Sequence, residues 1–123
     1  MTRPFAAVVL AITVSMPCLW AGSGFAQDCE RPDTPAQATE CATLRLRAAE
    51  REMAQYMGEL MKSDDAGFKE ALAAAQDAWM KWREAEGKLA GLVVTDRALE
   101  PVARLTAQAQ MTEDRVKDLR NMR

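Results

Sequence analysis

Apolar residues recur at alternating spacings of four and three along three stretches of the chain, the pattern of α-helices that each bury one face. No strand-like alternation of apolar and polar residues accompanies them. The predicted fold class is therefore all-α, a small three-helix bundle made of a helical hairpin and a third helix. The predicted seams are Ala42, Leu46, Ala49, Met53, Tyr56 and Leu60; then Phe68, Leu72, Ala75, Trp79, Trp82 and Leu89; then Val102, Leu105, Ala109, Thr112, Val116 and Leu119.

Capping residues and breaks mark the ends of these helices. Thr34-Pro35 predicts the first start, with a hydroxyl at the N-cap and proline at the first helical position. Ser63-Asp64-Asp65 interrupts the helical run and offers a cap for a second helix, expected to reach about Leu89. The second connection is predicted over residues 87–95, with Gly91 as the helix stop. The same spacing of seams also permits a coiled-coil dimer, so both monomer and dimer stay open.

The N-terminal segment is predicted to be a signal peptide, residues 1–26, followed by one helical domain, residues 27–123. Arg3 supplies a positive start, residues 5–16 are almost unbroken apolar sequence, and Gly24-Phe25-Ala26 offers small residues for cleavage after Ala26. An apolar run of about a dozen residues is too short to span a bilayer core of about 30 Å. We therefore expect a periplasmic or secreted protein with no stable membrane anchor after cleavage.

The cysteines and the charge fit an exported protein. Cys18 would leave with the signal peptide, so Cys29 and Cys41 remain and are expected to form a disulfide in an oxidising compartment. Such a crosslink would stabilise the fold by about 3 kcal/mol. The net charge is −2 over the whole chain. This sign is wrong for a nucleic-acid-binding protein.

Residues that carry catalysis are scarce. The chain has no histidine, which removes imidazole bases and histidine metal ligands. Ser63 is the only serine after the predicted signal peptide and has no base to activate it. The glycines are scattered singly and form no phosphate-binding loop. We expect no enzyme, no cofactor and no metal site.

Two groups of soft or aromatic side chains admit a functional interpretation beside a packing one. Met53, Met57 and Met61 form a methionine stripe, which either holds Cu(I) or fills the core. Trp79 and Trp82 are either an interface anchor or core residues of the second seam. We favour packing for both groups, because Met53 and both tryptophans fall on predicted seams.

Short motifs on the second and third helices resemble those of the LprI-like lysozyme-inhibitor family. The second helix reads Ala75-Gln76-x-x-Trp79-x-x-x-Arg83, and the third carries Thr112-x-x-Arg115-x-x-x-Leu119. Tyr56 and the pair Cys29 and Cys41 occur in matching order. The resemblance implies a non-enzymatic, disulfide-tied helical domain of the bacterial envelope with lysozyme as its protein partner, and it implies a structural role for the motif residues Tyr56, Gln76, Trp79, Arg83, Thr112, Arg115 and Leu119.

The chain departs from the family pattern in three places. The family's second cysteine pair would fall on Gly87 and near Ala107. An Asp and a Leu-Asn before the tyrosine would fall on Ala49, Glu52 and Met53. The Gly-Gly-Ser-like connection has become Gly91-Leu92-Val93-Val94.

The leading functional hypothesis is a periplasmic binding protein that inhibits lysozyme through the Gly87–Thr95 connection, since loops on a rigid scaffold commonly carry contacts. Acidic surface set against a cationic enzyme would mainly raise the association rate. The alternative is an envelope-stress or chaperone-like protein that binds unfolded chains or metal through methionine and aromatic faces. That alternative requires Met57, Met61 and Trp82 to lie on one open patch.

Overall fold

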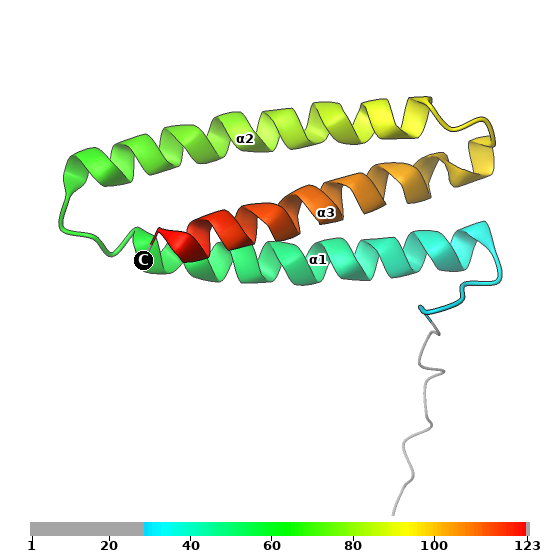
Figure 1. Ribbon diagram of the computed structural model, residues 1–123, viewed down its shortest axis with the longest axis horizontal. Helices are drawn as coiled ribbons and strands as arrows, with labels where there is room; N and C mark the ends of the chain where they lie inside the picture. The colour runs from blue at the N-terminus through cyan, green and yellow to red at the C-terminus, as the bar shows by residue number, and fades with distance from the viewer. Residues whose placement is uncertain (1–28, 123) are drawn as a thin grey trace, which may run out of the picture.

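The computed structural model describes residues 29–122 and consists of three long helices joined by short connections. Helix α1 spans Pro35–Leu60, α2 spans Ala66–Leu92, a short 3₁₀ helix η1 spans Arg97–Leu99, and α3 spans Glu100–Asn121. Helices α1 and α3 run in the same direction and α2 runs opposite to both (Figure 1). The all-α three-helix prediction is confirmed. The predicted signal peptide and its cleavage after Ala26 lie outside the described residues.

The helix starts follow from local capping. The side chain of Thr34 accepts a hydrogen bond from the Gln37 amide at 3.2 Å, and Pro35 occupies the first turn of α1. Asp65 accepts from the Phe68 amide at 3.0 Å and caps α2. Asp96 caps η1 in the same way. The caps predicted at Thr34 and within Ser63-Asp64-Asp65 are confirmed.

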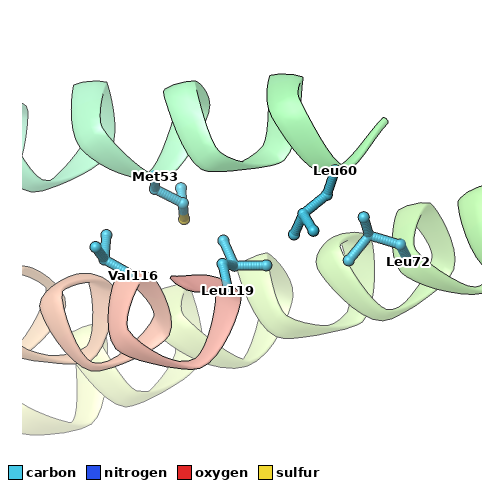
Figure 2. Close-up of a cluster of buried hydrophobic side chains, with 5 residues drawn as sticks. All are labelled: Met53, Leu60, Leu72, Val116 and Leu119. Carbon is cyan, nitrogen blue, oxygen red and sulfur yellow. The ribbon is translucent and has the colours of Figure 1, made fainter. Parts of the chain in front are cut away.

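The hydrophobic core lies at the end of the bundle where α1 passes into α2. Met53 and Leu60 of α1, Leu72 of α2, and Val116 and Leu119 of α3 point toward one another there (Figure 2). The first and third predicted seams are buried or half-buried at every position, so both are confirmed. Helix α3 packs along both other helices, whereas the backbones of α1 and α2 approach each other little.

The second predicted seam is wrong at Ala75, Trp82 and Leu89, which all face solvent. Trp82 is 55% exposed and is not a core residue. Apart from Leu72, the buried positions of α2 are polar or glycine: Gln76, Arg83, Gly87 and Gly91. A pattern based on hydrophobicity misses this face, because its polar groups find partners inside the bundle and its glycines allow the helices to approach closely.

The second connection is shorter than predicted. Helix α2 continues through Gly91 to Leu92, and Val93 is its C-cap. None of the described glycines has positive φ, so Gly91 is not a left-handed helix stop. A Cβ at this position would lie 3.1 Å from Glu100 Cγ and 3.3 Å from the Glu100 carbonyl oxygen. Gly91 therefore allows α2 to pack closely against the start of α3.

The predicted disulfide is confirmed. Cys29 and Cys41 are bonded, with their Cα atoms 5.5 Å apart, and the bond ties the segment before α1 to the second turn of that helix. None of the helices within residues 29–122 combines the length and the apolar character needed to cross a membrane.

Candidate functional site

The family-motif residues of α2 and α3 meet in one layer inside the bundle, which we call the signature layer: Gln76, Trp79, Arg83, Thr112 and Arg115. The Arg83 guanidinium lies 5.3 Å from the centre of the Trp79 ring, and that of Arg115 lies 6.0 Å from it. Arg115 Nε donates to Gln76 Oε1 at 3.2 Å, and Gln76 Nε2 donates to Met53 Sδ at 3.2 Å. The layer thus connects all three helices.

Arg83 is the most deeply placed charge of this layer, with 8% of its surface exposed. Its Nη1 donates to Glu50 Oε1 and to Thr112 Oγ1, both at 3.0 Å. The Thr112 hydroxyl is fully buried and in turn donates to the Gln108 carbonyl at 2.7 Å. Arg83 Nε is buried without a hydrogen-bond partner. A buried charge is tolerated only when paired and hydrogen-bonded, so this network fixes how α2 lies against α1 and α3.

The remaining motif residues, Tyr56 and Leu119, lie outside the layer. Leu119 has no exposed surface and belongs to the hydrophobic core. Tyr56 is half-buried beside Arg120, whose Nε donates to the tyrosine hydroxyl at 3.1 Å and whose guanidinium lies 5.4 Å from the ring. This hydrogen bond, with a second to Glu52, raises the pKa of Arg120. The motif residues are therefore interior or interhelical side chains.

A second set of hydrogen bonds between α1 and α3, made by Arg45, was not predicted from the sequence. Arg45 donates to Glu113 through Nε at 2.7 Å and through Nη2 at 2.6 Å, and its Nη2 also donates to Gln110 at 2.8 Å. The hydrogen bond from Arg45 lowers the pKa of Glu113 against the opposing effect of desolvation. Such pairs escape sequence reasoning because the partners are 68 positions apart.

The methionine stripe does not form an open face. Met53 is 7% exposed, Met57 is half-buried, and only Met61, at the end of α1, is well exposed. Trp82 lies sixteen positions beyond the start of α2, about 24 Å along the helix at 1.5 Å per residue. Met61 and Trp82 therefore do not share a patch. Within residues 29–122, no group of three His, Cys, Asp or Glu side chains is placed to hold a metal ion.

The opposite end of the bundle presents apolar surface around the α2–α3 connection. Val93 is 72% exposed and Leu99 is 40% exposed. Val94, Leu99 and Val102 line a shallow groove of about 500 Å³, together with Ala103, Thr106, Ala107 and Gln110. We call Val93, Val94, Leu99 and Val102 the apolar tip. Residues 87–92 of the predicted contact region are helical. This part of α2 ends beside the apolar tip but does not belong to it.

These features define a class: a small, disulfide-tied helical protein whose motif residues hold helices together and whose tip is apolar. A comparison with known protein families identifies the family. The sequence profile of the family described as lysozyme inhibitor LprI matches residues 29–119, which takes in α1, α2 and nearly all of α3. The chain belongs to this family. No curated protein and no solved structure matches the chain.

Proposed function

We propose that this protein is exported to the periplasm and inhibits a lysozyme there by direct contact through its apolar tip. Membership of the lysozyme inhibitor LprI family supports a protein partner of this kind. The observation that carries the choice of surface is the exposure of Val93 beside the groove lined by Val94, Leu99 and Val102. Apolar side chains on a preorganised scaffold bind with a small loss of conformational entropy.

The scaffold beneath the tip supports this role. Gly91 packs against Glu100 at the start of α3, and Asp96 caps η1, so the connection is short and held at both ends. The disulfide braces the beginning of α1, and η1 contacts that helix. A net charge of −2 favours the approach of a cationic enzyme by raising the association rate.

A turbidity assay of cell-wall lysis by a c-type lysozyme tests the proposal. The protein is expected to slow lysis in proportion to its concentration, and Val93→Asp is expected to abolish the effect by placing a charge in the apolar contact. Met61→Asp is the matched control, because Met61 is 40% exposed at the other end of the bundle. Undiminished lysis at excess wild-type protein would refute the inhibitor function. Equal inhibition by both variants would refute only the assignment of the apolar tip as the contact surface.

Export is tested separately. The full-length chain, expressed in a Gram-negative host, is expected in the periplasmic fraction with its N-terminus at Gln27. A chain that stays in the cytoplasm with its first residues intact would refute export without bearing on inhibition.

A further inference from the structure

A continuous apolar stripe on α2 faces solvent. Its members follow the alternating four-three spacing without a break, and every one is exposed. Trp82, Leu89 and Leu92 are 55%, 54% and 63% exposed. We call the set the α2 stripe: Ala71, Ala75, Ala78, Trp82, Ala85, Leu89 and Leu92. Single exposed apolar residues need no explanation, but a contiguous heptad stripe has the form of a coiled-coil seam without its partner.

The α2 stripe is separate from the face that α2 buries within the bundle. Leu72, Gln76, Arg83 and Gly87 pack against the other helices, and none of them belongs to the stripe. In Figure 1, no other helix lies on the side of α2 that is turned away from α3. The indole N–H of Trp82 donates to Glu86 at 3.2 Å, so the only polar group of the stripe's largest side chain has a partner on its own helix.

We propose that two copies of this chain associate through the α2 stripe, with the two α2 helices antiparallel. In one antiparallel register, each large residue of the stripe faces an alanine of the second copy. Trp82 faces Ala85, Leu89 faces Ala78, and Leu92 faces Ala75, because the sequence numbers of these pairs have the same sum. Alternating large and small side chains across facing positions lets such layers interdigitate. A parallel pair in register would instead set Trp82 against Trp82.

The charges beside the stripe are compatible with the same antiparallel orientation. Asp77, Lys81, Glu84 and Lys88 alternate in sign along one flank of α2. Reversing the second helix brings Lys88 to within two positions of Asp77 and Lys81 to within two positions of Glu84, an offset of about 3 Å along the axis at 1.5 Å per residue, which these side chains can span. In a parallel pair these flanks would lie on opposite sides of the interface, so the charges of the two copies would not meet. Side-chain size therefore selects the register, and the charges agree with the antiparallel orientation.

The facing layers run from Ala75 to Leu92, about 26 Å of helix at 1.5 Å per residue. An interface of this length lies near the lower end of specific interfaces, about 1,200 Å² in total. We therefore expect a reversible dimer with a dissociation constant in the micromolar range. This inference is independent of lysozyme binding.

Sedimentation equilibrium of the protein, purified after expression of the full-length chain in an exporting host, tests the association. The wild type is expected to pass from monomer to dimer as its concentration rises. Leu89→Glu is expected to raise the dissociation constant at least a hundredfold, because the twofold pair loses two apolar contacts and gains two carboxylates at the seam. Met80→Glu is the control, since Met80 is 44% exposed on α2 outside the stripe and should leave the constant unchanged.

A thiol cross-linking experiment tests the orientation. Ala75→Cys protein mixed with Leu92→Cys protein is expected to give a cross-linked dimer with a short reagent, whereas Ala75→Cys protein alone is not. Self-linking of Ala75→Cys would overturn the antiparallel register. A wild type that stays monomeric at about 0.5 mM, far above a micromolar constant, would overturn the proposal. So would a dimer that Leu89→Glu leaves intact.

Discussion

The close approach of α2 to α3 at Gly87 makes a quantitative prediction about the substitution Gly87→Ala. A Cβ at this position would lie 2.7 Å from both Cγ and Nε2 of Gln108 and 2.9 Å from Cδ. Gln108 is 6% exposed and its Nε2 donates to Glu84 at 2.9 Å, so the side chain cannot move away without losing that hydrogen bond. Alanine should therefore destabilise the fold here, although it is the better helix former.

Three contributions set the size of the effect. Replacing glycine by alanine inside a helix stabilises by about 1 kcal/mol. Losing a hydrogen bond to a charged acceptor costs about 1.5–3 kcal/mol, and overpacking a filled interior costs about 1–3 kcal/mol. The net expectation is a loss of about 3 kcal/mol in the free energy of unfolding, a large share of the 5–15 kcal/mol typical of a small domain.

Urea unfolding followed by circular dichroism measures this loss as a lower midpoint with an unchanged slope. Gly58→Ala is the matched control, because no atom lies within 4 Å of a Cβ placed there, and it should gain about 1 kcal/mol. Adding Gln108→Ala to Gly87→Ala should recover stability relative to the single variant by removing the collision. A Gly87→Ala protein as stable as the wild type would refute the close-packing argument.

Three further substitutions test other ties of the bundle. Glu113→Gln should cost about 0.5–1 kcal/mol at neutral pH. Because Arg45 lowers the pKa of Glu113, that contribution is present above the ordinary pKa of about 4.3 and is lost as the pH falls through the lowered pKa of the folded protein, so the urea midpoints of variant and wild type should converge in acid. Thr112→Val should cost about 2–3 kcal/mol in urea unfolding, because it removes a buried acceptor of an arginine hydrogen bond; an unchanged midpoint would contradict this. Replacing Cys29 and Cys41 by serine should cost about 3 kcal/mol, and reducing agent should destabilise the wild type but not this variant.

The sequence predicted helices α1 and α3 better than α2, and the reason lies in what each helix buries. The buried positions of α1 are apolar, so hydrophobic periodicity identifies them. Helix α2 buries Arg83 and Gln76 and leaves Trp82 outside, the reverse of what periodicity assumes. Only knowledge of partners such as Glu50 and Thr112 shows that these polar groups are satisfied.

The candidate site was predictable only in outline. The sequence pointed to the second connection as a contact region, and its apolar valines were visible as Val93-Val94. It did not show that Gly91 lies inside α2, because a glycine near the end of a helical pattern resembles a helix stop. The sequence also did not show the groove at the tip, since Leu99 and Val102 come to lie beside Val94 only because the chain turns at η1.

Gly87 also explains how this chain holds α2 to α3 at a position where the family resemblance expects a cysteine. The expected partner cysteine lies near Ala107, next to Gln108, which contacts Gly87. A Cβ at position 87 would lie 2.7 Å from Gln108 Cγ, and a carbon–carbon bond is about 1.5 Å long. The Cβ atoms of residues 87 and 108 would therefore be no more than about 4.2 Å apart. Disulfides span Cβ separations of about 3.5–4.5 Å. Helices α2 and α3 therefore lie as close together here as a disulfide would require. The contact at Gly87 and the hydrogen bond from Gln108 to Glu84 hold them at this distance. Losing both cysteines together leaves no stranded thiol, and the buried Arg83 network one helical turn away still fixes the register of α2.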